Sequence, residues 1–153
     1  MMKITIVTIG KLKEKYFQAA ASEYLKRLRP YVKLEMVELS VEPFGKSNKA
    51  AAKRIEAERI INFLDKHVGA HVFLLDEGGR ELTSEQLAKE LDKIQTEIIF
   101  VIGGALGFDP HLFSKYKMIS LSKLTFLHEM AKVILLEQLY RANAILRGKD
   151  YHY

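Results

Sequence analysis

The sequence predicts a single α/β domain, and three observations support this prediction. Short apolar runs alternate with longer amphipathic segments along the whole chain, as strands and helices do in a layered α/β structure. The length of 153 residues suits one domain with its own core. No internal repeat, low-complexity segment or linker divides the chain. We therefore expect one domain over residues 1–153.

Five runs of residues have the length and composition of strands, and they are Lys3–Ile9, Lys33–Leu39, His71–Leu75, Ile98–Ile102 and Met118–Leu121. The third and fourth are almost wholly apolar, as expected of central strands that are covered on both faces. The apolar start of the chain is short, contains threonines and ends in a lysine cluster, so it is read as a first strand and not as a signal peptide.

Helix signals lie between these runs. "TSEQ" at Thr83–Gln86 is a capping box. Asp109 followed by Pro110 is typical of an N-cap with proline at the first helical position. Residues 47–66 predict an amphipathic helix. The preceding stretch 41–48 contains a proline and a glycine, and is the one candidate for a mobile loop.

The last expected helix spans residues 128–147, with Thr125 as a plausible N-cap and Gly148 as the residue that ends it. Apolar residues fill most of its circumference, and such a helix needs burial on more than one face. One face can pack on the sheet and another on a second copy of the chain. We therefore expect a homodimer through this helix. The alternative is a fully internal helix in a monomer.

Composition and charge limit the classes of function. The chain has 24 lysines and arginines against 19 acidic residues, a net charge of +5, with much of the excess in the first sixty residues. A polyanion such as RNA would fit this charge, but so would solvated helix faces in a mildly basic protein. The absence of cysteine excludes disulfides and thiolate metal sites, and is compatible with a cytosolic protein. The five histidines lack metal-ligand spacing, and no apolar run is long enough for a membrane helix, so we expect neither a metal nor a membrane.

The stretch EIIFVIGGALGFDP, residues 97–110, leads an apolar strand into three glycines. A dinucleotide loop is disfavoured because Ile102 stands where the first glycine belongs and the loop follows the fourth strand. No Gly-Lys-Ser/Thr follows, which excludes a Walker-type phosphate loop. Ligands bind at the carboxyl ends of strands in open α/β sheets, and glycine lets the backbone approach a flat ring. On these residues alone, a ligand-binding loop and a plain tight turn both stay open.

Five segments together resemble a known family. They are TIGKLKEKY (8–16), FVIGGALG (100–107), LSKLTFLH (121–128), LLEQLYRA (135–142) and GKDYHY (148–153). In order and over essentially the whole chain, they are similar to the RlmH-type ribosomal large-subunit RNA pseudouridine-N3 methyltransferases of the SPOUT class. The resemblance implies a single SPOUT methyltransferase domain, with a C-terminal trefoil knot in a sheet flanked by helices and no separate RNA-binding domain. It also implies a cytoplasmic homodimer that uses S-adenosyl-L-methionine to methylate N-3 of a pseudouridine in large-subunit (23S) ribosomal RNA.

The resemblance also implies site residues. Cofactor contacts fall on Leu75, Gly103, Leu121, Ser122, Lys123, Leu124, Thr125 and Phe126, all at carboxyl ends of expected strands. The target base would be met by three residues near the end of the chain. His152 suits a base that removes the N-3 proton, Arg141 a group that stabilises negative charge on the ring, and Tyr151 a stacking or orienting group.

The chain departs from the family pattern at a few positions. It has leucine at position 127 and aspartate at 150 where proline is usual, and tyrosine at 153 where a basic residue is common. Glu129 and Lys132 replace glutamine and arginine. Two other functions stay open: a non-catalytic RNA- or ribosome-binding protein on a methyltransferase-like fold, and a nucleotide-binding oxidoreductase, which the missing first glycine disfavours.

Overall fold

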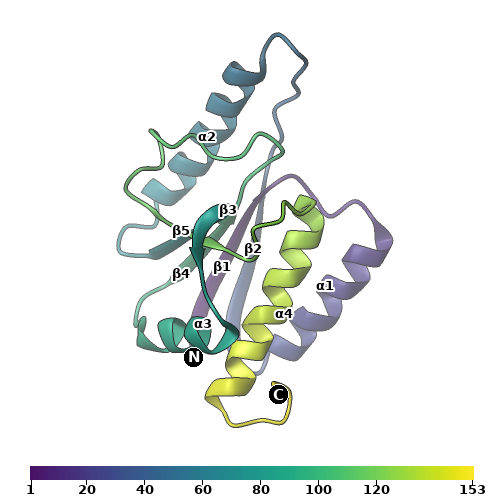
Figure 1. Cartoon of the computed structure of the whole chain (residues 1–153), viewed down its shortest axis with the longest axis vertical. Helices are drawn as coiled ribbons and strands as arrows, with labels where there is room; N and C mark the ends of the chain where they lie inside the picture. Colours follow the sequence, from purple (N-terminus) through teal and green to yellow (C-terminus); the bar gives the residue numbers. More distant parts are fainter.

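Five parallel strands form one sheet between two layers of helices in the computed structural model, which describes all of residues 1–153 (Figure 1). The spatial order of the strands is β2–β1–β4–β3–β5. The strands are β1 Met2–Ile9, β2 Val32–Leu39, β3 His71–Glu81, β4 Ile98–Ile102 and β5 Lys117–Ser120. The helices are α1 Lys15–Leu28, α2 Lys49–Asp65, α3 Ser84–Lys93 and α4 His128–Leu146. The predicted α/β class is confirmed.

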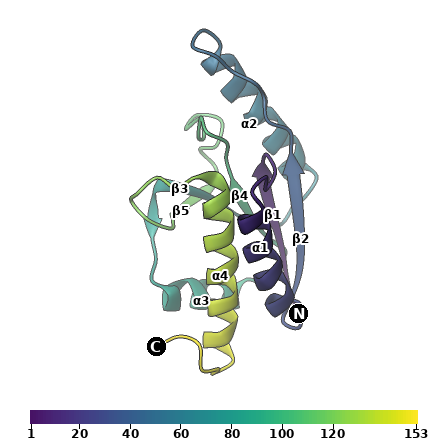
Figure 2. The ribbon, with the colours of Figure 1, turned by 90° about the vertical axis from the view of Figure 1, so that its right-hand side faces the viewer.

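Two apolar clusters fill the spaces above and below the sheet. Alternate residues of β4 belong to different clusters, and all five are buried, as a strand covered on both faces requires. One face packs against α1, α3 and α4, and the other packs against α2 and the loop after β4. Figure 2 shows α4 and α1 side by side on one face, with α2 on the other side of the sheet.

Two of the predicted helix signals are confirmed in detail. The Thr83 hydroxyl accepts from the Gln86 N–H at 3.1 Å, and the Gln86 side chain accepts from the Thr83 N–H at 2.8 Å, so the capping box is complete. Gly148 ends α4 with φ of +65°, a conformation that glycine adopts without strain. The Gly148 and Lys149 N–H groups close this end on the carbonyls of Ile145 and Ala144.

The helix expected after Asp109 does not form. Asp109 does cap a turn, since its carboxylate accepts from the His111 N–H at 2.8 Å and from the Leu112 N–H at 3.4 Å. Phe113 is then buried in the core on the α2 face of the sheet, and β5 begins at Lys117. The few residues between Asp109 and Lys117 form single turns, because so short a helix is only marginally stable.

Two other expected boundaries are wrong. Leu127, not Thr125, precedes α4, and the Thr125 hydroxyl instead donates to the Glu77 carboxylate at 3.3 Å. β3 does not stop at Leu75 but continues to Glu81, and its pairing with β5 is irregular between Leu75 and Arg80. The stretch before α2 forms no helix or strand; its mobility stays a prediction, as does the trefoil knot.

The loop after β1 is tied to the start of α4 by a buried carboxylate. Glu129 accepts from the backbone N–H groups of Lys13 and Glu14, which precede α1. Burial alone would raise the pKa of Glu129, but these hydrogen bonds more than offset it and the pKa lies below its usual value. The neighbouring Lys132 is 3% exposed, and burial lowers its pKa. None of the four helices is long and apolar enough to cross a bilayer.

Candidate active site

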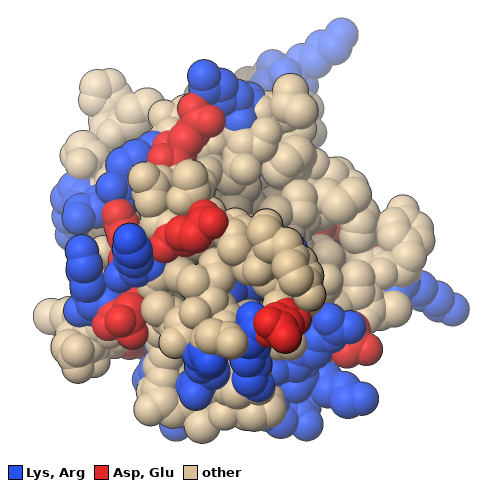
Figure 3. Space-filling view, turned by 60° about the horizontal axis from the view of Figure 1, so that its bottom comes forward, with Lys and Arg blue, Asp and Glu red and all other residues tan.

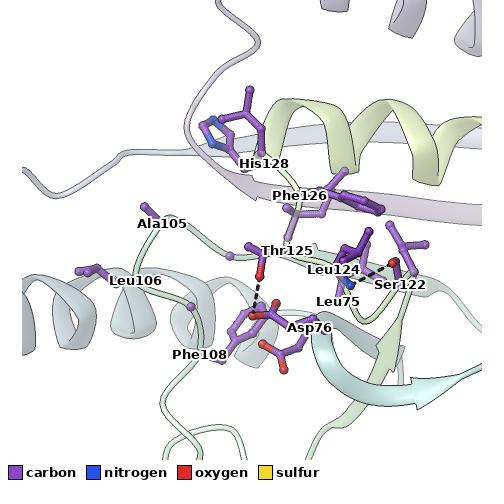
Figure 4. Close-up of a pocket in the computed structure, with 18 residues that line it drawn as sticks. Leu75, Asp76, Ala105, Leu106, Phe108, Ser122, Leu124, Thr125, Phe126 and His128 are labelled. Atoms are coloured by element: carbon purple, nitrogen blue, oxygen red, sulfur yellow. Dashed lines mark hydrogen bonds between the residues drawn. The ribbon is translucent and has the colours of Figure 1, made fainter.

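A cavity of about 550 Å³ opens at the carboxyl ends of β4 and β5, beside residues 75–77 of β3. Its walls are these residues of β3, the glycine loop 102–108 after β4, and residues 121–128, which connect β5 to α4 (Figure 4). A cavity of this size suits a small-molecule ligand. Its position is the one at which parallel α/β sheets bind their ligands.

The glycine loop presents bare backbone to the cavity. A Cβ atom on Gly104 would lie 2.8 Å from the Glu56 carboxylate, and one on Gly103 would lie 3.2 Å from the Phe108 ring. Gly107 has φ of +72°, which turns the loop back towards the sheet. Phe108 packs edge-on against Phe113 with 5.1 Å between the ring centroids, and this contact anchors the loop to the core on the α2 face of the sheet. The loop is therefore a wall with backbone amides and carbonyls close to any ligand.

The opposite wall is a hydrogen-bonded loop. The Ser120 hydroxyl donates to the Ser122 carbonyl at 2.7 Å, and the Ser122 hydroxyl accepts from the Leu124 N–H at 3.0 Å. The contact from Thr125 to Glu77 joins this loop to the end of β3 across the cavity (Figure 4). Serine and threonine hydroxyls thus hold the loop in one shape and leave its apolar side chains for the ligand.

The cavity is acidic although the protein is basic. Asp76 and Glu77 line it and no lysine or arginine does; His128 is the only other titratable side chain in its wall. One Asp76 carboxylate oxygen accepts from the Gly78 N–H at 2.9 Å. A site of this charge favours a cationic or neutral ligand and disfavours phosphates.

Seven of the eight residues predicted for the cofactor line the cavity: Leu75, Gly103, Leu121, Ser122, Leu124, Thr125 and Phe126. Lys123 does not, because its side chain is 81% exposed and pairs with Glu81 at 3.5 Å outside the cavity. Sequence reasoning missed Asp76, Glu77, Phe108 and His128. A signal for Asp76 and Glu77 was available in the sequence, because both follow the apolar run 71–75 directly. Residues that follow such a run are expected at the ligand-binding edge of a parallel sheet.

Arg141, Tyr151 and His152 are brought together, around the carboxylate of Glu137. Arg141 donates to this carboxylate through Nε at 3.0 Å and Nη2 at 2.5 Å, and the Tyr151 hydroxyl donates to it at 3.0 Å. The His152 ring lies between Arg141 at 3.1 Å and Glu85 at 2.7 Å. Since Arg141 can only donate, Nδ1 of His152 accepts and Nε2 carries the proton that is donated to Glu85.

The electrostatics of this cluster follow from these contacts. Burial, and then hydrogen bonds with Tyr24 and Glu137, raise the pKa of Tyr151 well above its ordinary value, so its hydroxyl stays protonated. The hydrogen bond to Glu137 raises the pKa of Arg141, and the hydrogen bond from His152 lowers the pKa of Glu85. These hydrogen bonds hold the tail against α3 and α4 of its own chain.

The cavity lies at the first turn of α4, whereas the cluster gathers around Glu137, nine residues further along the helix. His128 starts the helix at the cavity, and the tail follows its last turn. Nine residues of α-helix span about 14 Å. Arg141, Tyr151 and His152 do not line the cavity of their own chain, so the two parts of the predicted site are separate. No cluster of three or more histidine, aspartate or glutamate side chains is placed to hold a metal ion.

A parallel sheet with an acidic cavity at its carboxyl edge, walled in part by glycine backbone, is typical of the class of α/β proteins that bind a small organic cofactor or substrate. Within that class the chain belongs to the SPOUT methyltransferase family, because residues 2–152 match the family model described as "Predicted SPOUT methyltransferase". This confirms the resemblance at the level of the family, and with it the expectation of a methyltransferase.

Relatives with curated names are similar over the full length. The chain is 43% identical to "Ribosomal RNA large subunit methyltransferase H" of Symbiobacterium thermophilum and 42% identical to the protein of that name of Exiguobacterium sibiricum, with 99% of each chain covered. Among solved structures, a probable methylase family protein from Haemophilus influenzae matches 99% of this chain and 70% of its own, with a TM-score of 0.54. TrmJ from Z. mobilis matches 93% of this chain and 70% of its own, also with 0.54. At 14% and 15% identity these two matches support the fold alone.

Proposed function

We propose that this protein transfers a methyl group from S-adenosyl-L-methionine to N-3 of a pseudouridine in large-subunit ribosomal RNA, in the cytoplasm. The substrate rests on the full-length similarity to relatives named for this RNA. The cavity is the observation that supports this cofactor. It is acidic and lined in part by glycine backbone, and its negative charge disfavours phosphates.

The residues of the cavity fit the methyl donor. S-adenosylmethionine would supply a methyl group on a positively charged sulfur, together with an adenine ring and an amino acid. The glycine loop and residues 121–126 offer backbone groups and apolar side chains to the flat ring, and Asp76 and Glu77 offer negative charge to the cationic part. Holding the donor in one position is itself a large part of catalysis for an in-line displacement.

The target base would be met by Arg141, Tyr151 and His152 of a second copy of the chain. The tail of each chain gathers around Glu137, about 14 Å along α4 from the cavity end of the helix, and it does not line the cavity of its own chain. In a two-fold dimer with antiparallel α4 helices, each tail would lie beside the cavity of its partner. Exposed apolar side chains at the cavity end of α1 and α4 give such a contact its apolar surface: Tyr16 (66% exposed), Leu127 (57%) and Met130 (41%).

The three tail residues would act on the base and its proton. His152 can take the N-3 proton on Nδ1 once this nitrogen is free of Arg141. Arg141 can stabilise the negative charge that the ring gains as the proton leaves. Tyr151 can hold the base by its ring face or by its protonated hydroxyl. Each of these roles requires the tail to leave part of its present hydrogen-bond network.

The first experiment combines calorimetry with a transfer assay. We expect saturable binding of S-adenosylmethionine and no binding of NADH, and then transfer of a labelled methyl group to ribosomes that lack the modification, located by mass spectrometry of the RNA. His152→Ala should reduce turnover at least tenfold and leave the affinity for the donor unchanged. Donor binding without transfer to any ribosomal RNA would contradict the proposal and favour a non-catalytic RNA-binding protein.

A further inference from the structure

The end of the molecule that carries the tail also carries a set of lysines and arginines without acidic partners. They come from the last turn of α1, the turn after it, the start of β2 and the end of α4: Lys26, Arg29, Lys33, Arg147 and Lys149. All five are exposed, and none forms an ion pair. We call this set the basic end. In the view from this end, blue side chains gather in the lower part, with fewer red ones among them (Figure 3).

An aromatic ring holds two of these cations in fixed positions. The Arg147 guanidinium lies 4.6 Å and the Lys149 ammonium 4.2 Å from the centre of the Tyr31 ring. Tyr31 itself is half-buried, in the turn between α1 and β2. Cations over an aromatic face are attracted by it, so the ring keeps together two side chains of the same charge.

The backbone strengthens this arrangement. The Lys149 N–H donates to the Ala144 carbonyl at 2.9 Å and the Gly148 N–H donates to the Ile145 carbonyl at 3.2 Å, with Gly148 at φ of +65°. These are the two hydrogen bonds of a Schellman motif, and they turn the chain so that Lys149 returns beside Arg147. The position of both cations is thus fixed by the end of α4 and not by a flexible tail.

We propose that the basic end, centred on Tyr31, Arg147 and Lys149, binds backbone phosphates of the ribosomal RNA next to the nucleotide that is methylated. Two adjacent, unpaired and pre-positioned cations make a site for a polyanion, because they need no rearrangement to meet successive phosphates. The basic end lies at the same end of α4 as the chain's tail, so in the proposed dimer it would flank the partner's cavity. This inference rests on the proposed function, which names the RNA.

A simpler role for these cations is to stabilise the helices, since basic side chains at the carboxyl end of a helix interact favourably with its dipole. The two roles predict different losses. Removal of a dipole partner lowers the melting temperature and leaves RNA affinity unchanged. Removal of a phosphate contact lowers affinity and reduces its dependence on salt.

The test is the double variant Arg147→Gln with Lys149→Gln, measured by binding to purified large ribosomal subunits over a range of salt concentrations. The loss of two phosphate contacts should reduce the slope of log affinity against log salt by about 1.5, and affinity near 0.1 M salt should fall at least tenfold. S-adenosylmethionine affinity, measured by calorimetry, should stay the same. The matched control is Lys66→Gln with Lys89→Gln, two exposed lysines that form no ion pair, the first directly after α2 and the second on α3.

Tyr31 gives a second, independent measurement. Tyr31→Phe keeps the ring and should bind as the wild type does, whereas Tyr31→Leu keeps an apolar side chain without the ring and should bind several-fold more weakly. Unchanged salt slopes in the Gln variant, or an equal loss in the lysine control, would overturn the inference. Methyl transfer by the wild type in the same preparation distinguishes this result from failure of the proposed function. A wild type that neither binds nor methylates ribosomes would overturn both.

Discussion

Asp76 and Glu77 give the cavity a charge opposite to that of the whole protein, and this has a consequence for turnover. S-adenosylmethionine has a positive sulfur that its product, S-adenosylhomocysteine, lacks. Opposite unit charges a few ångströms apart attract by about 1 kcal/mol even in water, and by more where the protein screens less. If S-adenosylmethionine is the donor, the two carboxylates would favour it over the spent product and so limit product inhibition.

Asp76→Asn tests this charge selection. The amide keeps an oxygen for the Gly78 N–H, so the local turn should be preserved. We expect the donor to bind about three- to tenfold more weakly and the product to bind almost as before, since only the donor has a sulfonium charge that Asp76 can attract. Calorimetry with both ligands gives the ratio. Glu81→Gln, which removes an exposed carboxylate outside the cavity, is the control; an equal loss for donor and product in Asp76→Asn would contradict this explanation.

A second carboxylate, Glu97, is structural and lies at the amino end of the sheet. Burial alone would raise its pKa, but hydrogen bonds from His67 at 2.8 Å and Thr5 at 2.9 Å, together with Lys3 at 3.4 Å, outweigh burial, so the pKa lies below its usual value. A carboxyl group with a lowered pKa in the folded state contributes stability above its unfolded pKa and loses it as the pH falls through the folded pKa.

Glu97→Gln should therefore destabilise the protein at pH 7. The loss of unfolding free energy should become smaller as the pH falls below 4.5, the ordinary pKa of a glutamate carboxyl group. The measurement is the unfolding free energy by urea titration at intervals from pH 7 to pH 3. The difference between wild type and variant should narrow steadily over the acidic part of this range. A difference that stays constant down to pH 3 would mean that the charge of Glu97 does not contribute.

At the scale of single elements, Gly79 decides how β3 meets β5. A Cβ atom there would come within 2.7 Å of the backbone of Met118 and Ile119, which no small movement of a side chain can relieve. Gly79→Ala should separate the two strands and cost about 2–4 kcal/mol, which for this length lowers the melting temperature by roughly 4–16 °C. Gly45→Ala is the control, because its nearest neighbour, an Asn48 side-chain oxygen, lies at 4.0 Å. Equal melting temperatures for the two variants would contradict the close approach of the strands.

The elements that sequence predicts well are those that depend on local pattern. The apolar run of β4, the capping box of α3 and the glycine that ends α4 each have a signal within a few residues. α1 has no such signal, since neither an acidic residue in its first turn nor a capping side chain marks its start. Its start is fixed by Glu129, which is 115 residues away and caps it from another helix. Tertiary contacts also explain why Asp109 starts a turn and not a helix.

At the scale of the whole molecule, the two parts of the candidate site have different origins. Most of the cavity wall could be predicted because it consists of strand ends, which gather at one edge of any parallel sheet. The position of the tail could not be predicted, since only the observed direction of α4 takes Tyr151 and His152 away from that edge. The residues were found by family resemblance, but their distance from the cavity is a property of the three-dimensional structure.

Mixed dimers test whether the tail serves the cavity of its partner. One chain would carry Asp76→Lys with Glu77→Lys, which should repel the cationic donor, and the other Tyr151→Ala with His152→Ala. Each variant alone should be inactive. Dimers of one chain of each kind, purified with two different affinity tags, should regain about half the wild-type activity, because one cavity has an intact tail beside it. Continued inactivity of correctly mixed, folded dimers would show that the tail serves its own chain or none.

A tail that serves the cavity of another chain would make the concentration of the protein a variable of the reaction. If each cavity is completed by another chain, the rate at low concentration rises with the square of the amount of protein, and it becomes proportional only when nearly all chains are paired. A cell that makes few copies would then methylate slowly even with ample donor. The same arrangement would let a damaged chain inactivate a sound one, because a partner with a defective tail leaves a good cavity without its second half.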